Sequence, residues 1–393
     1  MKKILAIMLT LGLVFACAAC GGNETASTAS TESKAGTESV ASTDATTTDM
    51  KVALVTDVGS LDDESFNQAT WEGVTTFCDA NGIEYTYFQP QEDSTEERET
   101  KIAEAVAAGY NVIVMPGYLF GEAVSNAQND YPDVKFIAVD VSEGDVTDGK
   151  LESNAHCIVF SEEQAGYLAG YAAVKDGFTK LGFLGGMAVP AVIRYGYGFV
   201  YGADAAAEEL GTDVSIKYTY GGQFFGDATI TAKMEGWYSE GTEVVFACGG
   251  GIYTSALEAA VNNKKYVIGV DVDQSGLGVD YINGDNDKTA LGYNPFLTSA
   301  FKGLANSVSD TLGLIKDGKW DTVGGTFSTL GLTAGDYVGI PTDERAWNFR
   351  TFTVEEYEAI KAKLTDGSVV VSNDSSDDVH PEVGEHTTVD YIS

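Results

Sequence analysis

The sequence predicts an α/β protein with two similar lobes, in each of which helices flank a parallel sheet. Short apolar runs alternate with segments of helical periodicity from residue 51 onward, and this alternation is typical of parallel sheets. The alternation restarts near residue 180, so two runs of similar length follow one another. The expected folded part, about 51–364, is also longer than one ordinary hydrophobic core supports.

The individual elements are predicted from the spacing of apolar residues. Strands are short β-branched or alternating runs, whereas helices repeat apolar residues every three or four positions, as at Trp71, Val74 and Cys78. In the first run the expected strands are 52–55, 84–88, 112–115, 136–139 and 158–160, and the expected helices are 67–80, 95–108, 122–129 and 162–175. In the second run the expected strands are 181–184, 216–220, 244–247 and 266–270, and the expected helices are 195–210, 228–238 and 254–262.

The loop after the first strand carries polar side chains to the sheet edge where ligands bind. The carboxyl ends of parallel strands form that edge, and Asp62, Asp63 and Phe66 follow the strand 52–55 closely. Ionised carboxylates accept hydrogen bonds, and an aromatic ring offers a flat surface. The loop therefore suits a ligand with hydroxyl groups and a flat face. The alternative is that the acids cap the helix 67–80.

A further acid follows the last strand of the second run. The strand 266–270 leads into Asp271, whose carboxylate can accept two hydrogen bonds from vicinal hydroxyls such as a ribose diol. A helix cap is again the alternative. Glycine clusters such as Gly185-Gly186 lack the Lys-Ser or Lys-Thr of a phosphate loop. We expect them to allow close approach of ligand and backbone instead.

The composition argues against several classes of function. A formal net charge of -36 predicts repulsion from phosphate backbones, so nucleic-acid polymers are excluded as partners. Only His156 lies inside the expected folded part, and we expect a structural histidine rather than a member of a catalytic triad. Cys78, Cys157 and Cys248 lack disulfide or zinc-site spacing and are expected to be buried. We therefore predict no enzyme activity, no metal and no cofactor.

The two ends of the chain differ in composition from the rest. Residues 1–19 combine a basic start, a short apolar run and small residues, which is typical of a secretory signal. The segment resembles a bacterial lipoprotein signal with Cys20 as the lipidated residue. Cys17 is a second possible anchor, and an ordinary signal with a free secreted protein is the alternative. Residues 20–50 are expected to be the lipid anchor and a flexible tether, and 365–393 a solvated, disordered acidic tail.

Several short motifs follow one another along most of the folded part. They are Asp63-Glu64-Ser65-Phe66-Asn67-Gln68, Glu162-Glu163-Gln164-Ala165-Gly166-Tyr167, Gly182-Phe183-Leu184-Gly185-Gly186-Met187, Gly198-Phe199 with Gly202, Gly249-Gly250-Gly251, Gly269-Val270-Asp271-Val272-Asp273-Gln274, and Leu297-Thr298-Ser299 with Lys302. With these motifs the chain resembles the basic membrane protein family of substrate-binding lipoproteins, whose best-understood members bind purine nucleosides for ABC-type importers.

The resemblance implies a two-lobe periplasmic-binding-protein type I fold, in which the chain crosses the hinge between the lobes three times. On this basis we assign residues 51–157 and 273–316 to lobe 1. Residues 158–272 and 317–364 are assigned to lobe 2. Each lobe is expected to contain one parallel sheet flanked by helices, and the ligand is expected between the lobes.

The resemblance also implies which residues bind the ligand. Phe66 is expected to stack on one face of the base, and Phe224 or Phe225 on the other, with Phe225 favoured. Asp140 is expected to bond the edge of the base, and Gly250 to contact the ligand through its backbone. The ribose hydroxyls are assigned to Asp63, Asp271 and Lys302, and Asp62 and Asn67 complete the set of candidates.

The function implied by the resemblance is capture of a nucleoside, with a purine base preferred, outside the cytoplasmic membrane. A monomer, held to the membrane by its lipid, would hand the ligand to the permease subunits of an ABC importer. A monosaccharide-binding receptor of the same fold is the first alternative. A nucleoside-cleaving enzyme is the second.

Overall fold

The computed structural model describes residues 50–57 and 59–392. Every element below belongs to one compact unit within residues 45–393. The predicted signal segment, both anchor candidates Cys17 and Cys20, and the predicted tether up to residue 49 lie outside the described residues. No helix among the described residues has both the length and the apolar character needed to cross a membrane.

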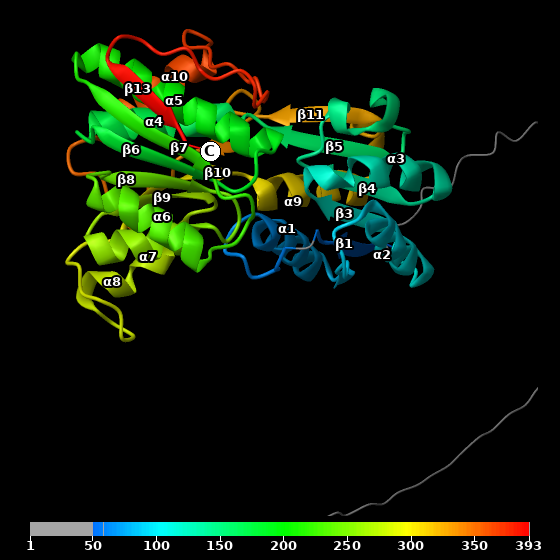
Figure 1. Ribbon diagram of the computed structural model, residues 1–393. Helices are drawn as coiled ribbons and strands as arrows, with labels where there is room; N and C mark the ends of the chain where they lie inside the picture. The colour runs from blue at the N-terminus through cyan, green and yellow to red at the C-terminus, as the bar shows by residue number, and fades with distance from the viewer. Residues whose placement is uncertain (1–49, 58, 393) are drawn as a thin grey trace, which may run out of the picture. The chain divides into compact units, whose positions relative to one another are not determined.

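The first sheet contains six strands that all run parallel (Figure 1). They are β1 (Lys51–Val55), β2 (Glu84–Phe88), β3 (Val112–Pro116), β4 (Lys135–Val139), β5 (Ala155–Phe160) and β11 (Thr326–Leu330), in the order β11-β5-β4-β3-β1-β2. Helices α1 (Phe66–Asn81), α2 (Thr95–Ala107), α3 (Gly121–Asp130) and α9 (Leu304–Lys316) accompany it. Because neighbouring side chains of a strand point to opposite faces, Leu54 shares a core with Val74 of α1, whereas Val55 shares another with Ile102 of α2.

The second sheet contains seven strands, of which β12 alone is antiparallel to its described neighbour. They are β6 (Lys180–Gly185), β7 (Val214–Tyr220), β8 (Val244–Cys248), β9 (Tyr266–Asp271), β10 (Phe296–Lys302), β12 (Val338–Gly339) and β13 (Thr387–Tyr391), in the order β12-β10-β9-β8-β6-β7-β13. The helices of this part are α4 (Glu162–Lys175), α5 (Pro190–Leu210), α6 (Ala228–Ser239), α7 (Tyr253–Asn263), α8 (Asp280–Asn283) and α10 (Val354–Thr365).

The chain passes between the two sheets three times. It crosses after β5, after β10 and after β11, as the strand orders of the two sheets require. The predicted α/β class, with two parallel sheets flanked by helices and three crossings, is therefore confirmed. Helix α9 returns to the first sheet and packs on α1, where the Ser309 hydroxyl donates a hydrogen bond to the backbone oxygen of Gly73.

The predicted lobe boundaries place two strands in a sheet different from the one in which the structure shows them. Strand β10 falls in the segment 273–316, assigned to lobe 1, but it pairs with β9 of the second sheet. Strand β11 falls in the segment 317–364, assigned to lobe 2, but it pairs with β5 of the first sheet. Strand periodicity shows which face of a strand is buried, but not which neighbour the strand pairs with.

The C-terminal segment ends in a strand, so the prediction of a disordered tail over 365–393 is wrong for its last part. Strand β13 pairs in parallel with β7 along five residues, from Thr387↔Val214 to Tyr391↔Tyr218. The ring of His380 stacks on that of Tyr391, with centroids 3.6 Å apart. The run from Thr387 to Tyr391 is rich in β-branched and aromatic residues, which favours a strand despite the acidic surroundings.

Helices α4 and α5 lie in unusually close backbone contact. A Cβ atom at Gly202 would lie 1.9 Å from the backbone oxygen of Tyr167, and one at Gly170 would lie 2.1 Å from that of Phe199. Only glycine permits this approach. The close packing fixes the N-terminal ends of both helices, where Glu162 and Arg194 are located.

The predicted structural roles of the histidine and the cysteines are confirmed. His156 lies 2.9 Å from the backbone oxygen of Thr326 through Nδ1 and is almost fully buried. Cys78, Cys157 and Cys248 are buried and free of disulfides. Burial raises the pKa of the Cys78 thiol to about 12, so this group is no nucleophile near neutral pH.

Candidate functional site

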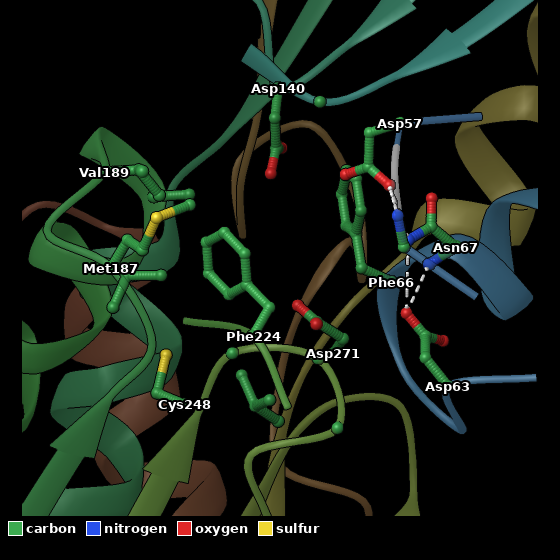
Figure 2. Close-up of a pocket in the computed structure, with 18 of the residues that line it drawn as sticks. Asp57, Asp63, Phe66, Asn67, Asp140, Met187, Val189, Phe224, Cys248 and Asp271 are labelled. Atoms are coloured by element: carbon green, nitrogen blue, oxygen red, sulfur yellow. Dashed lines mark hydrogen bonds between the residues drawn. The ribbon is translucent and has the colours of Figure 1, made fainter. Parts of the chain in front are cut away.

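A cavity of about 550 Å³ lies where the carboxyl ends of strands from both sheets face each other. Residues from the ends of β4 and β9 line it, as do residues that follow β1, β6 and β8. This is the position at which ligands bind in open α/β sheets. Figure 2 shows that the rings of Phe66 and Phe224 and the carboxylates of Asp140 and Asp271 project into it.

Two of the strand-end acids adopt an unusual backbone conformation. Asp140 has φ +60° and Asp271 has φ +66°, values that are uncommon for residues other than glycine. This left-handed conformation ends the extended strand at each acid. Both acids line the cavity, so the predicted placement of Asp140 and Asp271 at the sheet edge agrees with the structure.

Lys302 forms the centre of a buried charge cluster in the cavity. Its Nζ lies 2.5 Å from Oδ2 of Asp140, 3.4 Å from Oε1 of Glu162 and 3.8 Å from Oδ1 of Asp271. Arg194 forms a second ion pair with Glu162 at 2.7 Å. Burial alone would raise the pKa of Glu162, but Arg194 and Lys302 hold it below its usual value. The cluster thus keeps Glu162 ionised and connects residues on opposite sides of the cavity.

This cluster provides a hydrogen-bond partner for only one of the two carboxylate oxygens of Asp140. Burial raises its pKa to about 6, although the Lys302 ammonium opposes the shift. Its Oδ1 atom is buried and has no hydrogen-bond partner among the described residues. A buried carboxylate oxygen without a partner is costly, so a ligand that donates a hydrogen bond there is favoured.

Asp271 joins the two sides of the cavity. Its Oδ2 accepts a hydrogen bond of 2.6 Å from the hydroxyl of Ser65, which precedes α1. Burial raises the pKa of Asp271. The other oxygen, Oδ1, lies 3.8 Å from Lys302 Nζ, which is longer than a hydrogen bond. That oxygen therefore remains available to a ligand.

Asp62 and Asp63, the two candidate acids in the loop before α1, have different environments. Asp63 accepts hydrogen bonds from the backbone N–H groups of Ser65, Asn67 and Gln68 at 2.9, 3.0 and 3.1 Å, so the capping alternative applies to it. Asp63 still lines the cavity, and burial raises its pKa to about 6. Asp62 is exposed, bonds the Ser60 hydroxyl and does not belong to the cavity lining.

Asn67 lies in the cavity wall together with an acid that the sequence prediction did not include. Its Nδ2 donates to Oδ1 of Asp57 at 3.2 Å, and its own Oδ1 is buried without a partner among the described residues. Asp57 stands two residues after the end of β1 and lines the cavity. Burial raises its pKa. Its place after a buried strand was the available signal, the same one that identified Asp140.

The two neighbouring phenylalanines have different environments. Phe225 is 62 % exposed, whereas Phe224 is half-buried and projects into the cavity (Figure 2). Phe224 packs so closely that a Cβ atom at Gly186 would lie 2.4 Å from its ring. Gly250, with φ +50°, also lines the cavity next to the Phe224 backbone. Both rings line the cavity, and Phe224 is the more deeply buried of the two, whereas the sequence-based preference was for Phe225.

Further residues line the cavity that sequence reasoning missed. Met187, Val189 and Tyr195 come from the β6–α5 region, and Cys248 ends β8. Apolar residues of this kind look like ordinary core in a sequence, so no local signal separates them from it. No cluster of three or more His, Cys, Asp or Glu suited to a metal ion occurs within 50–57 and 59–392.

Comparisons with known proteins agree with this architecture. A family model described as ABC transporter substrate-binding protein PnrA-like matches residues 50–373. The chain is 34 % identical to "ABC transporter nucleoside-binding protein BmpA" of Lactococcus lactis over 73 % of this chain and 80 % of that protein. It is 32 % identical to the "CD4+ T-cell-stimulating antigen" of Listeria innocua over 84 % and 89 %.

A solved structure shows the same fold. A solute-binding protein of an ABC transporter system from Aeropyrum pernix superimposes with a TM-score of 0.68 and 21 % identity, covering 84 % of this chain and 95 % of that one. At that identity the likeness concerns the fold alone. The family match spans nearly all of the described residues, and the chain therefore belongs to the PnrA-like family of ABC transporter substrate-binding proteins.

Proposed function

We propose that this protein captures nucleosides, with a preference for purine nucleosides, in the cavity between its two sheets. The observation that carries the proposal is the pair of rings, Phe66 and Phe224, that project into one cavity beside buried hydrogen-bond acceptors. Aromatic rings stack on bases of any kind. The relative from Lactococcus lactis, named as nucleoside-binding, supports the same ligand class.

The hydrogen-bond acceptors fit the two ends of such a ligand. Oδ1 of Asp140 is offered to the ring N–H of an inosine or guanosine base, since it has no other partner among the described residues. Asp271 and Lys302 together provide an acceptor and a donor for ribose hydroxyls. Adenosine lacks that ring N–H, so inosine and guanosine are expected to bind at least as well.

In this proposal the protein acts as a monomer and delivers the ligand to the permease subunits of an ABC importer. Closure of the two lobes around the nucleoside is a hinge motion, and it is the signal that the permease recognises. The protein performs no chemistry on its ligand.

A binding screen tests the proposed function directly. Calorimetry with nucleosides, free bases, monosaccharides and amino acids is expected to show the tightest binding for purine nucleosides. Equal affinity for ribose and inosine would favour the monosaccharide receptor instead. Release of free base from inosine during incubation would show a nucleoside-cleaving enzyme.

The two phenylalanines provide a matched test of stacking. Phe224→Ala is expected to weaken inosine binding by about 1–3 kcal/mol, the usual contribution of one base–aromatic stack. Phe225→Ala is expected to weaken binding by less than Phe224→Ala, because the Phe225 ring also lines the cavity but is 62 % exposed. Isothermal titration of both variants decides between the rings, and a larger loss for Phe225→Ala would reverse the assignment.

The proposed membrane attachment is tested at the N-terminus. Cys20→Ala is expected to release the protein into the medium or leave its signal uncleaved, because a lipid chain rather than an apolar helix holds it. Cell fractionation with a radiolabelled fatty acid measures this, and Cys17→Ala is the control. Continued lipidation of Cys20→Ala would identify Cys17 as the anchor.

A further inference from the structure

The hydroxyl of Tyr195 is a buried polar group to which no structural or binding role has yet been given. The side chain is 1 % exposed and lines the cavity, and its hydroxyl has no hydrogen-bond partner among the described residues. Buried tyrosine hydroxyls usually find a partner. Leaving one without a partner costs free energy, which a ligand can recover.

The charged residues around Tyr195 indicate which end of the cavity this residue lies near. Lys302 Nζ lies 5.8 Å from the centroid of the Tyr195 ring. Burial raises the pKa of Tyr195 well above its usual value, and Asp271 is the charged neighbour with the largest further effect, followed by Glu162. The hydroxyl therefore stays neutral. Lys302 Nζ also lies 3.8 Å from Oδ1 of Asp271, which places the Tyr195 ring near the end of the cavity assigned to the sugar.

Most charged and polar side chains near the Tyr195 hydroxyl already contact one another. Asp140 and Glu162 contact Lys302, and Ser65 occupies one oxygen of Asp271. The second oxygen of Asp271 and the Tyr195 hydroxyl remain for a ligand. A neutral hydroxyl can donate, whereas a carboxylate only accepts. One ligand hydroxyl can therefore accept a hydrogen bond from Tyr195 while it donates to Asp271.

We propose that the Tyr195 hydroxyl is a further ligand contact, which binds one hydroxyl of the nucleoside sugar beside Asp271. The inference rests on the proposed function and adds a specificity-determining residue to it. Tyr195 selects ligands with a sugar hydroxyl at this position, and it disfavours the corresponding deoxynucleoside, which leaves the buried tyrosine hydroxyl without a partner.

The test combines Tyr195→Phe with ligands that lack single hydroxyls. Calorimetry is carried out with inosine and with 2′-, 3′- and 5′-deoxyinosine on wild type and variant. Tyr195→Phe is expected to bind inosine roughly three- to tenfold more weakly, as for one neutral hydrogen bond. The same variant is expected to lose no affinity for the one deoxyinosine that lacks the contacted hydroxyl.

Tyr238→Phe is the matched control for loss of a buried tyrosine hydroxyl. Tyr238 is also buried, but its hydroxyl donates to the backbone oxygen of Tyr266 at 2.7 Å, and it does not belong to the cavity lining. Its replacement is expected to lower the ligand-free Tm and leave inosine affinity unchanged. Tyr195→Phe is expected to weaken inosine binding without lowering the ligand-free Tm, because it removes a buried hydroxyl that has no partner there.

Two results would overturn the assignment of Tyr195. An equal loss of affinity for all four nucleosides would show an effect on cavity shape rather than on a sugar contact. Unchanged inosine affinity would show that the hydroxyl does not touch the ligand. In both cases the wild type still binds inosine, so the proposed function stands. A wild type that binds no nucleoside would instead overturn the proposed function and this assignment with it.

Discussion

Lys302→Met is expected to lower the free energy of unfolding by about 3–5 kcal/mol, the usual cost of removing one partner from a buried ion pair. The Lys302 side chain is 2 % exposed and lies within 4 Å of three carboxylates, those of Asp140, Glu162 and Asp271. Methionine has a similar volume but no charge. Glu162 then keeps its ion pair with Arg194, whereas Asp140 and Asp271 lose their pairing with Lys302. Inosine binding is expected to be lost as well.

Urea unfolding measures this effect, and its pH dependence identifies the cause. In the wild type, burial already raises the pKa of Asp140 from 3.8 to about 6, and loss of the lysine raises it further. The folded variant then binds more protons than the unfolded chain, so its stability falls as pH rises through this range. The deficit relative to wild type is therefore expected to be smallest below about pH 6, where Asp140 is protonated in both proteins, and to grow as the pH rises above 6.

Lys319→Met is the control for loss of a lysine from an ion pair. Lys319 pairs with Asp317 at 3.0 Å, but both side chains are more than half exposed. This variant is expected to change stability by less than about 1 kcal/mol, with no such pH dependence. If Lys302→Met unfolds like the control, the buried cluster does not depend on its lysine.

Asp271→Ala is expected to weaken inosine binding by about 2–3 kcal/mol, or roughly 30- to 150-fold, because it removes a charged acceptor from buried sugar hydroxyls. Binding of hypoxanthine, which has no sugar, is expected to change little. Calorimetry with both ligands compares the two ends of the cavity. Equal losses for nucleoside and base would remove Asp271 from the sugar contacts.

Asp271 both contacts the proposed ligand and bonds Ser65 on the other side of the cavity. Ser65→Ala tests the second role alone. The Ser65 hydroxyl donates to Asp271 across 206 positions in the sequence. Its removal breaks that bond but keeps the carboxylate for the ligand. A loss clearly smaller than that of Asp271→Ala is expected, and a loss of equal size would assign the Asp271 effect to lobe closure.

Local patterns predicted most elements closely, and local chemistry explains the exceptions. The helix predicted at 95–108 is observed as α2 (Thr95–Ala107), with the Ser94 hydroxyl accepting the Glu97 N–H as its cap. The helix predicted to begin at 195 begins at Pro190 instead. Proline at the first helical position is itself a start signal, because it has no N–H to leave unbonded.

The acids of the site were easier to predict than its rings. Asp140 and Asp271 follow buried strands, and the carboxyl edge of a sheet brings such residues together whatever their distance in sequence. Phe224 and Phe225 lie in an irregular segment between β7 and α6, where no period of two or 3.6 fixes their direction. Tyr195 has the spacing of an ordinary core residue in α5, so only the three-dimensional structure identifies its unpaired hydroxyl.

The pairing of late strands with early ones has a consequence for how the chain folds as it is made. Strand β11 completes the first sheet beside β5, and β13 covers β7 in the second. A chain synthesised from its N-terminus forms β5 and β7 long before these partners exist, so both strands have unpaired edges in the meantime. The nascent protein therefore remains open to edge-to-edge aggregation until β13 is available, and a chain that stops before β13 keeps the β7 edge exposed.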